Sequence, residues 1–245
     1  MIVKIKPFRE EKYGMIFIMY SIFVDFEMQP VSQEDFPEEY KICHTEIIEV
    51  GAVVLDDKNK EIASFKRYVR PKYSDYIDEH IKDLTGITIK RLKKAPLFES
   101  VQKEFMQWCH HYRDFTIYAW SNNDKHQFIK EMELKQIAQG EDEEYMLSHW
   151  VDFQKEYGTL VGAAYSLSLE KALYMAGELF DGKAHDALYD ARNTAFLFAK
   201  SRDTKNFLKE VKRIKEMAGN EEPTTYAIGS SIDFDTLKEK IEKNS

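Results

Sequence analysis

The feature that most constrains this chain is an apolar run at residues 16–24 that leads into Asp25, Phe26 and Glu27. A run this rich in β-branched and aromatic residues is typical of a fully buried strand. Because side chains alternate along a strand, Asp25 and Glu27 point to one face and Phe26 to the other. Paired carboxylates at a buried strand end need a cation, a proton or hydrogen-bond donors. A divalent metal ion is the simplest answer, and a surface Asp-x-Glu beyond a strand end is the alternative.

Composition indicates a globular chain of 245 residues, with 43% hydrophobic residues and a net charge of -8. That charge gives no general attraction for nucleic acid or anionic membranes, so a polyanionic partner needs a local basic patch or metal ions. Cys43 and Cys109 lack the spacing of a zinc site or a disulfide framework, so we expect a cytoplasmic location. The apolar run is about half of the ~20 residues that cross a bilayer. We therefore expect no membrane span and no signal peptide.

The rest of the pattern predicts an α/β fold. Residues 29–44 are interpreted as a loop, and residues 46–55 and 64–70 as strands joined by a hairpin turn. Short helical pieces broken at Thr85-Gly86 then extend to residue 94. The remaining expected elements are a helix at 95–112, strands at 115–120 and 149–153, a helix after Asp124, and helices at 166–176 and 186–200. Strands that first form a meander and then alternate with helices predict a mixed sheet with helices on its faces.

Three parts are expected along the chain. Residues 1–14 are a polar lead-in, residues 15–204 form the main domain, and residues 205–245 form a helical extension. The extension contains a lysine-rich, exposed helix at 205–217, a polar linker at 219–231 and a short amphipathic helix marked by Phe234, Leu237 and Ile241. Residues 141–144 are all acidic and are interpreted as a solvated charge cluster.

Two further carboxylates stand at element junctions. Asp124 follows a buried strand and opens a helix, where an N-cap role is the alternative. Asp190 lies one turn inside a helix with an alanine-rich packing stripe, a place where a carboxylate needs a cation opposite it. His185 lies five residues earlier and would point away from Asp190 if both were helical, so we place it on the preceding loop, with Asp186 at the cap. A lone histidine there is more commonly a surface or packing residue, and only the neighbouring acids suggest otherwise.

This pattern resembles the DEDDh family of 3′-5′ exonucleases, which has the ribonuclease-H-like fold. The resemblance covers residues 16–200 and rests on Asp25-x-Glu27, on Asp124 after a strand ending in Trp, and on His185-x-Ala187-x-x-Asp190. Residues 46–53, 84–88, 151–153 and 168–173 also look like that family in order and spacing. The sequences of residues 186–193 and of the Thr-Gly-Ile segment look closest to one branch of the family. That branch contains exonucleases that trim small interfering RNA and histone mRNA ends, together with the KapD-type sporulation-inhibitor proteins.

The resemblance implies a five-stranded mixed sheet, with three antiparallel strands followed by parallel strands. It implies hydrolysis of single-stranded RNA or DNA from the 3′ end, releasing nucleoside 5′-monophosphates. Two Mg²⁺ or Mn²⁺ ions would be held by four carboxylates, those of Asp25, Glu27, Asp124 and Asp190. His185 would take the proton from the attacking water. The last bases would pack on the backbone at Phe26 and Met28 and on the turn at Leu84, Thr85 and Gly86.

The sequence departs from the family in two places and leaves two alternatives. Ser121 stands after Trp120 where the family has Gly, and the acidic loop at 34–39 lies where a polyanionic substrate would pass. The basic stretch at 82–94 either neutralises a few phosphates or is a solvated helix face. The alternatives are a regulatory protein-binding module on the same fold and a metal-dependent phosphodiesterase for dinucleotides. The five intact site residues favour an enzyme, while a protein partner and the oligomeric state stay open.

Overall fold

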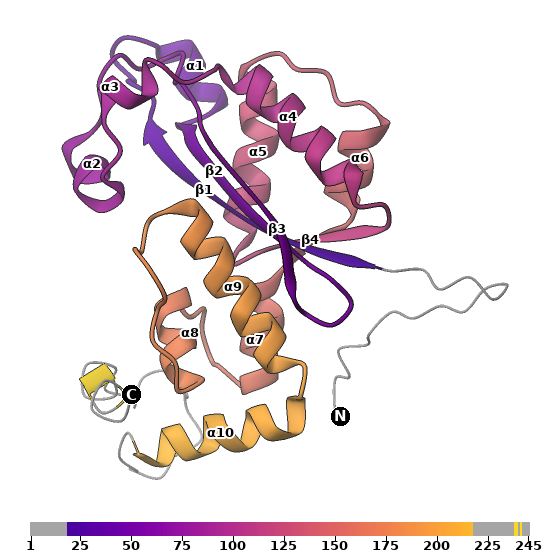
Figure 1. Cartoon of the computed structure of the whole chain (residues 1–245). Coiled ribbons are helices and arrows are strands. Elements are labelled where there is room, and N and C mark those ends of the chain that lie inside the picture. The colour runs from indigo at the N-terminus through magenta and orange to yellow at the C-terminus, as the bar shows by residue number, and fades with distance from the viewer. Residues whose placement is uncertain (1–18, 218–237, 240, 242–245) are drawn as a thin grey trace, which may run out of the picture.

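The computed structural model describes residues 19–217, 238, 239 and 241. The predictions for the lead-in at 1–14, the linker at 219–231 and the side chains of Phe234 and Leu237 lie outside these residues. Five strands form one sheet in the order β3-β2-β1-β4-β5, with helices on both faces (Figure 1). The predicted mixed sheet is therefore confirmed.

The antiparallel half of the sheet comprises β1 (Tyr20–Pro30), β2 (Thr45–Leu55) and β3 (Glu61–Tyr68). β2 pairs antiparallel with both β1 and β3. The turn between β2 and β3 is closed by Asp56, whose carboxylate accepts the backbone N–H groups of Lys58 and Lys60 at 2.9 Å each. The predicted hairpin is confirmed, with β3 beginning three residues earlier than expected.

The parallel half adds β4 (Phe115–Ala119) beside β1 and β5 (Trp150–Asp152) beside β4. The pairing of β1 with β4 ends at Val24 and Ala119, whereas β1 stays paired with β2 as far as Pro30. The prediction that Asp25 and Glu27 end their strand is therefore wrong. The strand continues because β2 supplies backbone hydrogen-bond partners. The two carboxylates lie where β1 is still paired with β2 but no longer with β4.

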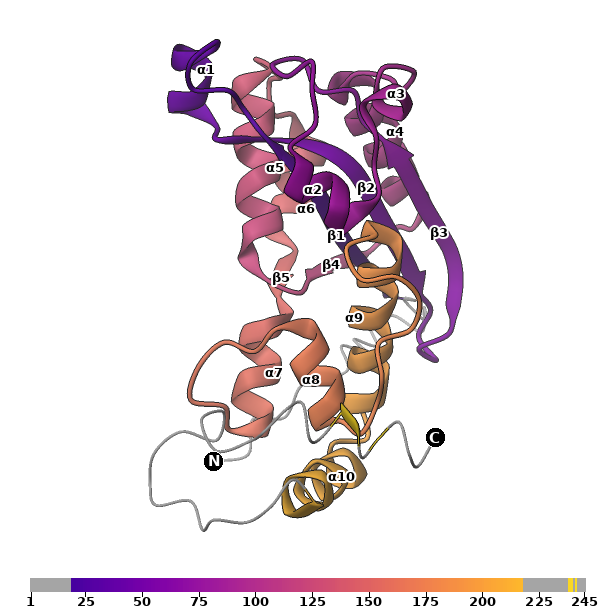
Figure 2. The ribbon, with the colours of Figure 1, turned by 90° about the vertical axis from the view of Figure 1, so that its left-hand side faces the viewer.

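The two faces of the sheet carry different cores, which follow the alternation along β1. Ile22, Val24 and Phe26 pack in the core on one face, whereas Phe23 packs in the core on the other. Helices on the first face are α4 (Phe98–His111), α5 (Asn122–Leu134) and α6 (Glu141–Ser148). Helices that extend the second core are α7 (Phe153–Val161), α8 (Leu169–Met175), α9 (Ala187–Ser201) and α10 (Thr204–Met217). Figures 1 and 2 show these two groups of helices apart from each other.

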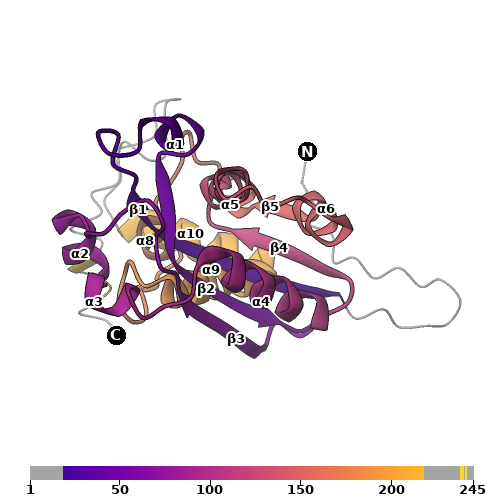
Figure 3. The same cartoon turned by 90° about the horizontal axis from the view of Figure 1, so that it is seen from above.

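Three short helices lie toward one end of the sheet, where α1 stands apart from α2 and α3 (Figures 2 and 3). They are α1 (Pro37–Ile42), α2 (Glu79–Thr85) and α3 (Ile89–Leu92). The break at Gly86 is confirmed, since Gly86 caps α2 in the left-handed conformation at φ 70°. The prediction of a loop throughout 29–44 is wrong, because Pro37 at the first turn, followed by two glutamates and a closing Lys41, suits a short helix.

Three helices differ from expectation. The acidic cluster at 141–144 is the first turn of α6, where acids favour the positive end of the helix dipole. α7 was not predicted at all. α10 was expected to be exposed, yet it buries Phe207, Val211 and Ile214, which recur at helical spacing. No helix in the described part of the chain is both long and apolar enough to cross a membrane.

Candidate active site

The site is built on one face of the antiparallel sheet, at two adjacent rows of paired residues. Asp25 pairs with Gly51 and Gly51 with Lys66 in one row. Glu27 pairs with Glu49 and Glu49 with Tyr68 in the next row. Because cross-strand partners share a face, three carboxylates and one lysine are presented together.

Gly51 makes room in this face for α9. A Cβ built on Gly51 would come within 2.1 Å of the backbone carbon of Ala187 and 2.2 Å of the nitrogen of Leu188. The first turn of α9 therefore lies directly over β2, at the level of Asp25. Asp190 is in that turn, and Figure 2 shows the upper end of α9 against the sheet. The predicted carboxylate one turn inside the helix thus reaches the strand acids.

Asp25, Glu27 and Asp190 form a compact cluster. Each offers a carboxylate oxygen, and these oxygens lie within 4.8 Å of one another. The oxygens come from elements more than 150 positions apart in the sequence. Such spacing suits a hard divalent cation, which takes oxygen ligands from carboxylates.

Asp124 lies beside the cluster, on the open side of β1, and is not one of the three acids whose oxygens lie within 4.8 Å of one another. Its carboxylate accepts the N–H of Phe26 at 3.2 Å, a group that is free because β4 ends one residue before Asp25 in the register. Ser121 is the N-cap of α5 and its hydroxyl accepts the N–H of Asn123. The N-cap alternative for Asp124 is therefore wrong, and serine in the place of the family's glycine serves as the cap.

Burial and mutual repulsion make these acids reluctant to ionise. Burial, and then the charge of Asp124, raises the pKa of Asp25 well above its ordinary value. Burial and the nearby Asp190 raise the pKa of Glu27 to about 8. Burial raises the pKa of Asp124 and of Asp190 to about 7 each, against the lowering effect of backbone N–H donors. A divalent cation would relieve both causes at once, so the donor set fits a metal centre.

His185 stands at the edge of the cluster. It lies in the turn before α9 with a left-handed backbone at φ 61°, and its side chain is exposed. Asp186 is the N-cap of α9, as expected, and its carboxylate accepts the N–H of Leu188 at 3.2 Å. The imidazole makes no hydrogen bond with the described residues. It is free to turn toward a substrate.

The four predicted substrate residues lie in two places. The Phe26 side chain packs against Phe128 and Trp150 on the face opposite the cluster, so only its backbone borders the site. Met28 is half-buried. Thr85 ends α2, and its carbonyl oxygen accepts the ammonium of Lys183 at 2.7 Å, while Leu84 precedes it. This hydrogen bond joins the turn after α2 to the loop that carries His185.

Sequence reasoning missed a charged frame beneath the cluster. Glu49 is almost fully buried, and its carboxylate accepts the N–H of Ala187 at 3.0 Å. Lys66 lies 3.1 Å from the other oxygen of Glu49 and also pairs with Asp186. The frame ties β2 and β3 to the first residues of α9. The available signal was Glu49 itself, an acid in the middle of a continuous apolar strand.

The sequence model of the exonuclease family RNase_T matches residues 22–198, and the chain belongs to that family.

Among known proteins, the chain is similar to 3′-5′ exoribonuclease 1 of Rattus norvegicus, with 28% identity over 187 residues. That match covers 72% of this chain and 51% of the rat protein, so the chain spans about half the length of that relative. It is also 31% identical over 91 residues to 3′-5′ exonuclease crn-4 of Caenorhabditis elegans, covering 36% of this chain and 28% of that protein.

Solved structures share the fold. The nuclease domain of 3′hExo, a DEDDh family member bound to rAMP, superposes with a TM-score of 0.64 at 23% identity, covering 75% of this chain and 92% of that one. The cell-death related nuclease CRN-4 superposes with a TM-score of 0.63 at 21% identity, covering 76% of this chain and 64% of that one. The ribonuclease-H-like fold expected from the sequence is confirmed.

Proposed function

We propose that this chain is a metal-dependent 3′-5′ exonuclease of the DEDDh type that acts on single-stranded RNA or DNA and releases nucleoside 5′-monophosphates. The observation that carries the proposal is the convergence of Asp25, Glu27 and Asp190 within 4.8 Å, with Asp124 beside them on the N–H of Phe26. The names of the rat and nematode relatives support the direction of hydrolysis. RNA is the favoured substrate because the rat relative is named an exoribonuclease.

The four acids are proposed to hold two Mg²⁺ or Mn²⁺ ions. When bound, the two ions would stabilise negative charge on the attacking and leaving oxygens of an in-line displacement. Asp25 lies among the other acids, since Asp124, Asp190, Glu27 and Glu49 all raise its pKa. Asp25, Glu27, Asp124 and Asp190 would hold the ions.

His185 is proposed as the general base. A histidine imidazole can take a proton from water and pass it on at neutral pH. Its position on an exposed turn beside the acids leaves the imidazole able to face a bound strand end. Glu27 would contact the terminal 3′-hydroxyl, and the backbone at Phe26 and Met28 and the turn at Leu84 and Thr85 would support the last bases. A cytoplasmic location is part of the proposal, consistent with Cys43 and Cys109 as free, buried thiols.

The polarity of degradation tests the proposal. Purified protein is incubated with single-stranded RNA and DNA carrying a label at either end, with Mn²⁺ or with EDTA. We expect 5′-labelled strands to shorten stepwise and 3′-labelled strands to release labelled mononucleotide at once, only with Mn²⁺. Hydrolysis confined to dinucleotides would instead support the phosphodiesterase alternative. Absence of metal-dependent release from every substrate would support the protein-binding module.

A further inference from the structure

A second pocket lies beyond the C-terminal end of β1, among the segments around the three short helices. Its volume is about 580 Å³, within the usual range for ligand sites. The residues that matter for its chemistry are Phe36, Arg70, Lys72, Asp75, Ile89 and Lys93. Phe36 immediately precedes α1, residues 70–75 follow β3, and Ile89 opens α3. None of these residues belongs to the acidic cluster.

The pocket is cationic in an acidic chain. Arg70, Lys72 and Lys93 are all exposed, and none of them forms an ion pair within the described part of the chain. Two acids, Asp35 and Asp75, also line the pocket. The carboxylate of Asp35 accepts a hydrogen bond from the Ser32 hydroxyl at 2.7 Å. The ammonium of Lys72 lies over the Tyr73 ring, 5.4 Å from its centroid. In a chain with a net charge of -8, three cations without an ion pair around one hollow make a local binding surface for phosphate.

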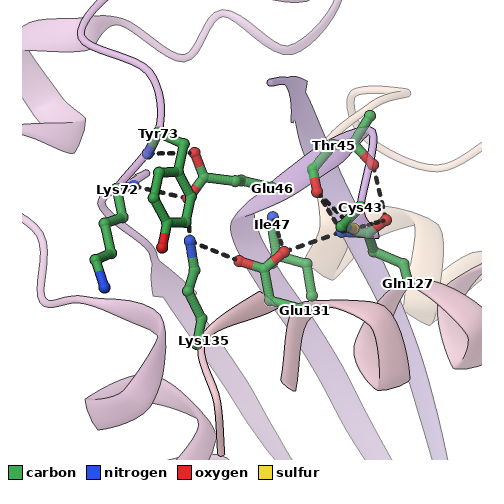
Figure 4. A network of polar contacts seen from close by, with 9 residues as sticks. All are labelled: Cys43, Thr45, Glu46, Ile47, Lys72, Tyr73, Gln127, Glu131 and Lys135. Atoms are coloured by element: carbon green, nitrogen blue, oxygen red, sulfur yellow. Dashed lines mark hydrogen bonds and ion pairs between the residues drawn. The ribbon is translucent and has the colours of Figure 1, made fainter. Parts of the chain in front are cut away.

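The backbone at Lys72 is fixed from behind by a buried network (Figure 4). The N–H groups of Lys72 and Tyr73 donate to the carboxylate of Glu46 at 2.7 and 2.8 Å. Glu46 is fully buried and pairs with Lys135, whose ammonium also lies 3.6 Å from Glu131. The backbone of this wall is therefore preformed, which lowers the entropic cost of binding there.

The pocket also offers an apolar surface. Phe36 is half-buried and packs edge-on against Tyr73, with ring centroids 5.5 Å apart. Ile89 and Pro71 complete the apolar lining. Apolar and aromatic surface next to cations matches a nucleotide, which has a flat base and an anionic phosphate. The exposed Asp75 can accept hydrogen bonds from the exocyclic amine of a base.

Two segments that line the pocket follow segments of the proposed catalytic site along the chain. Phe36 lies nine residues after Glu27, in the segment that follows β1. Ile89 lies three residues after Gly86, and Gly86 belongs to the turn that is proposed to support the last bases. We infer that the pocket binds a nucleotide of the substrate strand upstream of the terminal one, with Arg70, Lys72 and Lys93 contacting backbone phosphates. This inference rests on the proposed exonuclease function and adds a preference for strands longer than a dinucleotide.

A length series of 5′-labelled single-stranded RNA from 2 to 12 nucleotides tests the inference. The variant combines Lys72→Ala and Lys93→Ala, both at exposed side chains. The matched control combines Lys58→Ala and Lys60→Ala, exposed lysines in the turn at the opposite end of β2 and β3. We expect KM for the 12-mer to rise about tenfold in the pocket variant, with kcat and dinucleotide KM unchanged. The slope of log KM against log salt concentration should also fall by about 1.4, because two phosphate contacts are lost.

Equal length dependence of KM in the wild type and the pocket variant would overturn the inference. A wild type that hydrolyses no strand would instead overturn the proposed function. In that case binding of a fluorescent 12-mer in the presence of Ca²⁺, measured by anisotropy, still decides the question of the pocket. Weaker binding by the pocket variant than by the control supports the pocket, and equal binding by the two refutes it.

Discussion

Asp25 is paired across the sheet with Gly51, and the side chain that Gly51 lacks is replaced by the backbone of Ala187 at the start of α9. One glycine thus sets how closely the helix that carries Asp190 approaches the strand that carries Asp25. The acidic cluster depends on this close packing as much as on the acids themselves.

Gly51→Ala is therefore expected to damage both stability and activity. The added methyl group would meet backbone atoms at 2.1–2.4 Å, so α9 must move outward and take Asp190 with it. Overpacking of this kind costs about 1–3 kcal/mol, occasionally more. Gly158→Ala in α7 is the matched control, because its nearest neighbour would be at 3.9 Å and alanine favours a helix. Thermal unfolding and turnover of both variants check this, and a Gly51→Ala protein as active as the Gly158→Ala control would contradict it.

Lys66 is expected to position α9 through its pairs with Glu49 and Asp186. Lys66→Met leaves the buried Glu49 without its cation, so we expect a loss of about 1–2 kcal/mol in the free energy of unfolding and a lower kcat. Lys66→Arg should restore much of both.

Arg67→Met provides the control for Lys66, since Arg67 lies on the opposite face of the same strand and forms an exposed pair with Glu104 of α4. Exposed pairs contribute about 0–1 kcal/mol. Chemical denaturation and steady-state kinetics measure the difference. Equal effects of Lys66→Met and Arg67→Met on kcat would show that Lys66 does not position the site.

His185→Ala is expected to lower the rate about 10²-fold or more while leaving folding intact. Its side chain is exposed and makes no hydrogen bond with the described residues, so its removal leaves no buried group without a partner. Mn²⁺ should raise the melting temperature of the variant as much as that of the wild type. Single-turnover hydrolysis measures the rate, and unchanged turnover would remove His185 from the mechanism.

Glu131 predicts a pH dependence of stability that is separate from catalysis. Burial raises its pKa to about 8, since the ammonium of Lys135 is shared with Glu46. An acid with a raised pKa in the folded state binds its proton more tightly there than when unfolded. The stability that it contributes is complete below the unfolded value, near pH 4, and is lost as pH rises toward about 8.

The melting temperature of the wild type should therefore fall more between pH 5.5 and 8.5 than that of Glu131→Gln. Glu133→Gln, at an exposed residue on the same helix, should behave like the wild type. A fall of equal size in Glu131→Gln and the wild type would show that Glu131 does not titrate in this range.

The sequence pattern and the family resemblance together predicted a mixed five-stranded sheet and singled out the acids described above, whose role as metal ligands stays a prediction. Asp25 and Glu27 interrupt an apolar run, and Asp124 and Asp190 stand at positions where an acid is costly without a partner. Their meeting point could not be obtained from the pattern alone, because the register of β1 against β2 and β4 depends on the whole sheet. For the same reason Gly51 and Glu49 could not be connected with α9.

The unpredicted elements have local explanations. Phe153, Tyr157 and Val161 are all buried at helical spacing in α7, yet Gly158 and Thr159 weaken the helix signal of that segment. β1 was expected to end at the acids because charged residues rarely continue a buried strand. It continues because β2 supplies backbone hydrogen-bond partners as far as Pro30.

The most direct measurement is Mn²⁺-dependent hydrolysis of a 5′-labelled single-stranded RNA by the wild type and by Asp25→Asn, with unfolding of both followed in EDTA. We predict a ladder that shortens from the 3′ end and releases nucleoside 5′-monophosphates in the wild type. Asp25→Asn should be inactive although it melts no lower than the wild type without metal, since a repelled carboxylate has been removed. An Asp25→Asn protein as active as the wild type, or a wild type inactive with every divalent cation, would contradict the two-metal site described above.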